Sequence, residues 1–164
     1  GWVHCFTAPR ALTLRGGRVI ACPYLPGLPL APATLEGAPT DAAGARVAEL
    51  EGSRSWRLAF DASYEGALSV RIGSDSGLSI TLEEGRLTVD LSGTRYPHGG
   101  RRVVTLDAGE ASRVEILHDR SITEIYLGDG SRVFTTRTFL QGEGAGVTLS
   151  GAASVTNVSA VRAD

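Results

Sequence analysis

The chain has 164 residues, of which 42% are hydrophobic and 21 are glycine, and its formal net charge is −2. A chain of this size corresponds to one domain and buries roughly 70% of the surface that its unfolded form exposes. The small net charge, with no cluster of basic residues, argues against a nucleic acid as partner. No apolar run approaches the roughly 20 residues that a membrane-spanning helix needs, so we expect no membrane partner either.

Neither end shows the basic, then apolar, then small-residue pattern of a signal peptide. The chain opens on Gly1-Trp2 and contains no methionine. These features favour a piece of a longer protein. Its localisation, bacterial cytoplasmic or secreted, is left undetermined.

Residues 1–23 predict short strands on either side of a tight turn. The turn is Gly16-Gly17, because glycine reaches positive φ without steric cost. Cys5 and Cys22 stand in the outer strands of this segment. They could form a disulfide if these strands are adjacent in a secreted protein, whereas free buried thiols are the alternative that we favour. The expected strands span residues 3–7, 11–14 and 18–22.

Residues 24–44 are rich in Pro and Gly and show no steady period, so we expect a surface connection within the domain. From residue 45 to residue 164 short strands alternate with glycine turns, and no window has the spacing of an amphipathic helix. This pattern predicts an all-β antiparallel sandwich or barrel. The expected strands span residues 46–50, 55–62, 67–72, 78–82, 86–91, 101–106, 146–150 and 155–161.

The stretch from Ser112 to Phe139 predicts three strands in succession. If Asp129-Gly130 is a two-residue hairpin loop, Leu127 faces Arg132 and Glu124 faces Thr135. Glu124 and Arg137 then lie on one face as diagonal neighbours and are expected to pair. Apolar residues share that face, which favours a pair buried in the sandwich or covered by another protein surface. The alternative is a solvated cross-strand pair, which contributes little.

This stretch resembles the signature near the C-terminus of glycoside hydrolase family 32, which includes invertases, levanases, inulinases and sucrose-6-phosphate hydrolases. The matching positions are Asp119-Arg120-Ser121, Glu124-Ile125-Tyr126, Gly128-Asp129-Gly130 and Arg137-Thr138-Phe139. The departures are His118 for Val, Tyr126 for Phe and Gly128 for Asn. Near the other end, a second set resembles the stretch where the family's catalytic domain hands over to its C-terminal domain: Gly1-Trp2, Pro9-Arg10, Leu12, Leu14, Gly17 and Pro23.

The resemblance implies a two-sheet antiparallel β-sandwich, jelly-roll-like and of the concanavalin/glucanase kind. It also implies a parent enzyme of the β-fructofuranosidase type that hydrolyses sucrose or fructans, with a five-bladed propeller as the catalytic domain and as the partner of this one. Whether the parent acts on sucrose, sucrose 6-phosphate, levan or inulin is left open, as is a homodimer. Residues 1–23 would then be the junction with the propeller, and residues 45–164 the main sandwich.

Catalytic residues are not expected in this chain. Retaining glycosidases need two carboxylates about 5–5.5 Å apart, and in the family they belong to Trp-x-Asn-Asp-Pro, Arg-Asp-Pro and Glu-Cys motifs of the propeller. None of these motifs occurs here. We therefore expect structural or interface roles for Asp119, Arg120, Ser121, Glu124 and Arg137.

Other kinds of site find little support in the sequence. The three histidines, His4, His98 and His118, lie far apart without cysteines or carboxylates at ligand spacing, so neither a metal nor a cofactor is expected. A carbohydrate-binding, lectin-like module is the alternative function. Aromatic residues make up only 6% of the chain, and Trp56 alternates with Leu58 and Phe60 as a core row would. The aromatic side chains left as candidates for exposure are Trp2, Tyr64 and Tyr96.

Overall fold

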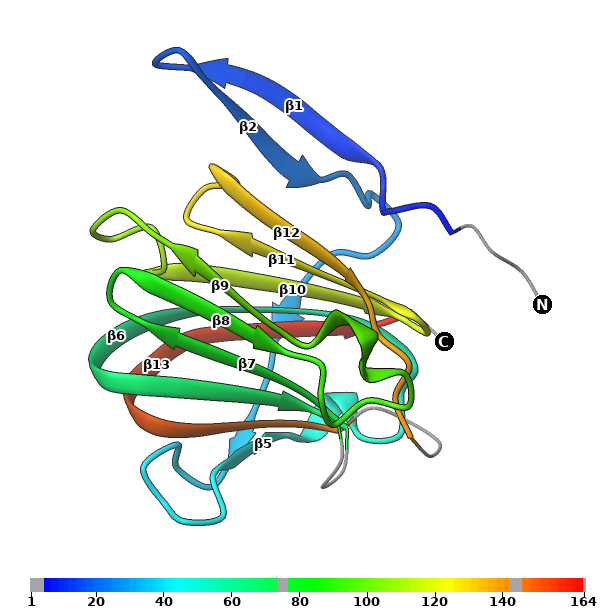
Figure 1. Ribbon diagram of the computed structural model, residues 1–164, viewed down its shortest axis with the longest axis vertical. Helices are drawn as coiled ribbons and strands as arrows, with labels where there is room; N and C mark the ends of the chain where they lie inside the picture. The colour runs from blue at the N-terminus through cyan, green and yellow to red at the C-terminus, as the bar shows by residue number, and fades with distance from the viewer. Residues whose placement is uncertain (1–4, 74–76, 142–145, 164) are drawn as a thin grey trace.

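A computed structural model describes residues 5–73, 77–141 and 146–163 (Figure 1). In chain order its strands are β1 (Arg10–Arg15), β2 (Arg18–Pro23), β3 (Ala31–Pro32), β4 (Leu35–Glu36), β5 (Ala45–Val47), β6 (Ser55–Ile72), β7 (Leu78–Glu83), β8 (Arg86–Asp90), β9 (Arg101–Thr105), β10 (Arg113–Asp119), β11 (Ile122–Leu127), β12 (Arg132–Arg137) and β13 (Val147–Arg162). Two short 3₁₀ helices, η1 (Ala48–Leu50) and η2 (Pro97–Gly99), interrupt them. Within the described ranges no helix is long and apolar enough to cross a membrane. The expected all-β sandwich is confirmed.

Two long strands run through both layers of the sandwich. β6 pairs with β10 through its first half and with β7 through its second half, and β13 lies antiparallel beside it. Figure 1 shows both strands curving together at one side of the molecule. One layer therefore has the order β12–β11–β10–β6–β13–β3, and the other has the order β9–β8–β7–β6–β13–β5–β4.

β6 and β13 each join two predicted strands into one bent strand. We expected Gly66 to separate residues 55–62 from residues 67–72, but β6 continues through it. A side chain at Gly66 would approach the Ala152 Cβ atom to 3.0 Å, so this glycine allows the two bent strands to lie close together. The predicted strands 146–150 and 155–161 likewise form one strand, β13, whose register shifts at two bulges.

The core lies between the two layers. Trp56, Leu58 and Phe60 of β6 are buried, with exposed fractions of 1%, 0% and 0%, as their alternation predicted. Ile80 of β7 and Ile116 of β10 are fully buried in the same core from opposite layers. Because each strand presents every second side chain to the core, β10 and β11 are held in one register.

The segment before the sandwich differs in detail from the prediction. Within residues 3–7, which were expected to form a strand, residues 5–7 are not in a strand, and residues 3 and 4 lie outside the described residues. The connection 24–44 contains the two-residue strands β3 and β4. The predicted strand 46–50 is β5 followed by η1, because the last residues turn into the sandwich and bury Leu50.

Candidate functional site

The N-terminal hairpin of β1 and β2 docks on the turn between β11 and β12. The hairpin is a two-stranded sheet of its own, and Figure 1 shows it standing beyond the β12 edge of the sandwich. The Ala21 N–H donates to the Gly130 carbonyl at 2.9 Å, and the Cys22 thiol donates to the Asp129 carbonyl at 3.2 Å. The two segments that carry the family resemblance, at opposite ends of the chain, are therefore in contact.

The predicted register of β11 and β12 is confirmed. Leu127 pairs with Arg132 and Glu124 pairs with Thr135. The turn itself is closed one residue earlier than expected, because the Gly130 N–H donates to the Leu127 carbonyl at 3.1 Å across Gly128 and Asp129. Gly128 has a φ of 62°, which suits glycine at this place.

Glu124 is the centre of the docked interface. Its side chain is 1% exposed and forms a salt bridge with Arg10. The Ala8 N–H donates to Oε1 at 2.7 Å, and the Tyr126 hydroxyl donates to Oε2 at 2.9 Å. Three donors from two distant segments therefore satisfy one buried carboxylate, as a buried charge requires.

The predicted pairing of Glu124 with Arg137 is corrected by this network. The carboxylate is bound by Arg10, a residue 114 positions away in sequence, while the Arg137 guanidinium lies 4.8 Å from the centre of the Phe139 ring. Docking of the hairpin brings Arg10 over the face that carries Glu124. Local alternation of side chains along a strand cannot predict a contact between residues so far apart in sequence. The Pro9-Arg10 match near the N-terminus was the signal that could have pointed to it.

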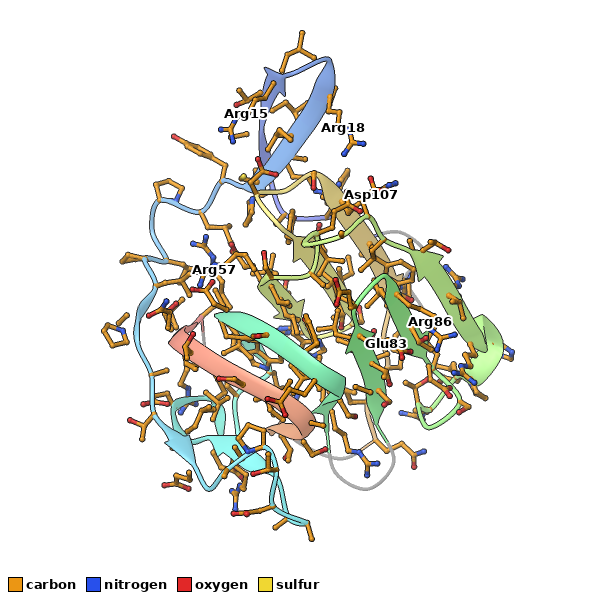
Figure 2. The ribbon with its side chains drawn as sticks, turned by 90° about the vertical axis from the view of Figure 1, so that its left-hand side faces the viewer. Arg15, Arg18, Arg57, Glu83, Arg86 and Asp107 are labelled. Atoms are coloured by element: carbon orange, nitrogen blue, oxygen red, sulfur yellow. The ribbon has the colours of Figure 1, made fainter. Side chains whose placement is uncertain are left out.

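Two further arginines of the hairpin pair with acidic groups of the sandwich. Arg15 lies 2.8 Å from Asp129, and Arg18 lies 3.3 Å from Asp107 and 3.6 Å from Glu110. Figure 2 shows Arg15 and Arg18 on the hairpin, with Asp107 below Arg18. The pairs with Asp129 and Asp107 are exposed on both sides and contribute little each, whereas Glu110 is only 9% exposed.

The Asp119-Arg120-Ser121 segment forms the turn between β10 and β11. Arg120 has a φ of 52°, and its N–H donates to the Arg54 carbonyl at 2.9 Å. Asp119 accepts a hydrogen bond of 2.8 Å from the Ser55 hydroxyl. The turn is thus tied on both sides to the start of β6.

His118 is buried beneath the docked segment. Its side chain is 1% exposed, its ring centre lies 5.4 Å from that of Trp56, and its Nδ1 lies 2.9 Å from the Thr123 hydroxyl. Burial lowers the pKa of His118 to about 4, and the nearby Asp119 carboxylate offsets only part of that shift. The ring is therefore neutral at physiological pH.

A cavity of about 460 Å³ lies between the N-terminal segment and this part of the sandwich. Trp56, His118 and Glu124 contribute to its wall from the sandwich side. The N-terminal segment contributes Phe6, whose side chain is 98% exposed.

The hairpin carries exposed apolar side chains on one face. Leu12, Leu14 and Val19 are 68%, 74% and 60% exposed. Leu14 lies directly opposite Val19 in the register, and Leu12 is two residues from Leu14 on the same strand, so the three share one face. These three residues are called the apolar strip below.

The remaining candidates are dispersed. Cys5 and Cys22 are free thiols. The prediction that they are buried is wrong for Cys22, which is exposed. Tyr64 donates to the Ala111 carbonyl at 2.8 Å, Tyr96 is 48% exposed, and Trp2 lies outside the described residues. No group of three or more His, Cys, Asp or Glu side chains within the described ranges could hold a metal ion.

Gly130→Ala tests whether docking of the hairpin requires the close approach of its backbone to the turn between β11 and β12. Gly130 has a φ of 95°, and a Cβ atom there would lie 2.5 Å from the Ala21 carbonyl oxygen. We expect a loss of about 2–3 kcal/mol in the free energy of unfolding and faster hydrogen exchange at the Ala21 amide. Gly109→Ala is the control, because Gly109 also has a positive φ but open space around it. Equal losses in the two variants would show that only backbone strain matters.

The fold and the docked hairpin define a two-layer β-sandwich with an attached N-terminal element. Residues 37–163 match the family described as "Glycosyl hydrolases family 32 C terminal". The chain is 31% identical over 157 residues to a probable sucrose-6-phosphate hydrolase of Vibrio cholerae, covering 93% of this chain and 27% of that protein. The chain therefore belongs to glycoside hydrolase family 32, as a C-terminal domain of that family.

Solved structures show the same fold. A sucrose-6-phosphate hydrolase from Lactobacillus gasseri matches with a TM-score of 0.77 and 18% identity, covering 99% of this chain and 34% of that one. A β-fructofuranosidase from Bombyx mori matches with a TM-score of 0.72 and 22% identity, covering 95% of this chain and 32% of that one. The chain thus spans about a third of these proteins and just over a quarter of the curated relative.

Proposed function

We propose that this chain is the non-catalytic C-terminal sandwich of a β-fructofuranosidase-type enzyme, in which it holds a catalytic propeller in place. Residues 1–23 would be the junction between the two domains. The observation that carries the proposal is that ion pairs bind the hairpin to the sandwich, while its apolar strip stays exposed.

The apolar strip is the proposed contact with the propeller. Large apolar side chains that share one exposed face mark interaction sites. The three relatives described above are about three times the length of this chain or longer, so they contain enough additional chain to form a second domain. A lasting contact between the two domains needs roughly 1,000 Å² of buried surface, which the strip alone does not supply. We expect neighbouring parts of the N-terminal segment to contribute the rest.

The proposal predicts that the purified 164-residue chain shows no turnover of sucrose, sucrose 6-phosphate, inulin or levan. Four carboxylates that contact the docked hairpin, Glu124, Asp129, Asp107 and Glu110, are held in ion pairs with its arginines, whereas a retaining glycosidase needs one carboxyl as acid and another as nucleophile. Reducing-sugar assays check this, with an intact enzyme of the family as positive control. Measurable hydrolysis that co-purifies with the chain would contradict the proposal.

The same preparation separates this role from that of a sugar-binding module. Calorimetric titration with inulin and levan is expected to show no saturable heat. Tyr96, the most exposed of the described aromatic candidates, lies beside His98 and Phe139 at ring distances of 6.5 Å and 5.1 Å, so it does not stand as an isolated flat platform. Saturable binding of either fructan would favour the module instead.

A further inference from the structure

The cavity beneath the N-terminal segment has largely apolar walls and one cationic group without a partner. Its apolar lining comes from both sides: Phe6, Pro9, Leu25, Leu28, Leu117 and Ile122. Arg120 also lines the cavity. Within the described part of the chain its guanidinium forms no ion pair or side-chain hydrogen bond.

The backbone holds Arg120 in this place by an unusual conformation. Its φ of 52° lies in the left-handed region, which residues other than glycine and asparagine seldom adopt. The hydrogen bond from its N–H to the Arg54 carbonyl keeps the turn in that state. A strained residue at the wall of a cavity is a reason to look for a function there.

Neither carboxylate that lines the cavity neutralises Arg120. Asp119 accepts a hydrogen bond from Ser55, and Glu124 is saturated by Arg10, Ala8 and Tyr126. Arg120 is exposed, so a carboxylate from another domain can reach its guanidinium beside the apolar wall. The complementary chemistry is a carboxylate carried on or next to an apolar side chain.

We infer that this cavity receives an acidic side chain and an adjacent apolar side chain from the catalytic domain, with the carboxylate bound by Arg120. The inference rests on the proposed function. A protein occupant is favoured over a small molecule because Phe6, in the cavity wall, and the apolar strip belong to the same N-terminal segment and are all exposed. One interface would cover both.

The test compares Arg120→Gln in this chain and in a full-length enzyme that contains it. Arg102→Gln is the matched control, because Arg102 is an exposed arginine on the edge strand β9. The measurement is the unfolding temperature of the sandwich, followed by hydrogen exchange of β10 and β11. In the isolated chain we expect no shift for either variant. In the full-length enzyme we expect a fall of roughly 2–4 °C for Arg120→Gln alone.

Each other result has a definite meaning. An equal fall in both forms of the chain would show that Arg120 acts within the sandwich and would overturn the inference. If the propeller stabilises the sandwich but Arg120→Gln has no effect, the inference fails and the proposed function stands. If the propeller leaves the unfolding of the sandwich unchanged, both fail. Stabilisation of the isolated chain by free propionate, lost in Arg120→Gln, would assign the cavity to a small carboxylate and overturn the protein occupant.

Discussion

Glu124→Ala in the 164-residue chain is expected to lower the free energy of unfolding by about 2–3 kcal/mol, or roughly 4–12 °C in unfolding temperature. The substitution leaves the Arg10 guanidinium, the Tyr126 hydroxyl and the Ala8 N–H without their common acceptor. The expected loss is at the low end for a broken buried pair, because the Arg10 side chain is 26% exposed and water can reach it. Urea unfolding, read as the midpoint and slope, measures the effect.

Glu83→Ala is the matched control for Glu124→Ala. Glu83 pairs with Arg86 at 2.7 Å on the surface, with side-chain exposures of 33% and 54% (Figure 2). Exposed pairs of this kind contribute less than about 1 kcal/mol, so its loss should be small. Equal losses for the two variants would show that Glu124 is no more important than a surface glutamate. Faster hydrogen exchange at Ala21 in Glu124→Ala alone would place the loss in hairpin docking.

Acid is expected to destabilise the chain through His118. The pKa of His118 in the folded chain is about 4, below its ordinary value of 6.5. Between these values the unfolded chain binds a proton that the folded chain does not, so stability falls as the pH falls from 6.5 towards 4 and the loss saturates below 4. A shift of this size corresponds to a loss of about 3 kcal/mol.

His118→Gln tests that expectation, because glutamine can still meet Thr123 but does not titrate. Urea unfolding at a series of pH values between 7 and 4 should show a flatter profile for this variant than for the unchanged chain. His98→Gln, at the exposed turn η2, is the control and should leave the profile as it was. If the two variants give the same profile as the unchanged chain, His118 does not cause the acid sensitivity.

The local register of the signature was predictable, because two local signals agree there. Alternation of period two assigns each side chain of β11 and β12 to a face, and the Gly-Asp-Gly sequence places the turn between them. Counting outward from the turn then gives the observed pairing of Glu124 with Thr135. Only the residues that close the turn differ.

The contacts made across the chain were not predictable in the same way. Arg10 meets Glu124 because the hairpin folds back over β11, and that docking depends on close approach at Gly130 rather than on any local period. Gly66 shows a related limit, because a glycine within a strand pattern can mark either the end of a strand or a close approach between two backbones. In this fold Gly66 allows β6 and β13 to lie close together where both strands bend.

We propose that the charged residues of the signature stabilise the structure and that the chemistry belongs to another domain. The most direct test of this proposal is a full-length enzyme that carries Glu124→Ala, assayed for its initial rate of sucrose hydrolysis and for its half-life during heating. We expect a nearly unchanged initial rate per folded molecule and a shortened half-life. An unchanged half-life with the initial rate abolished would contradict the proposal.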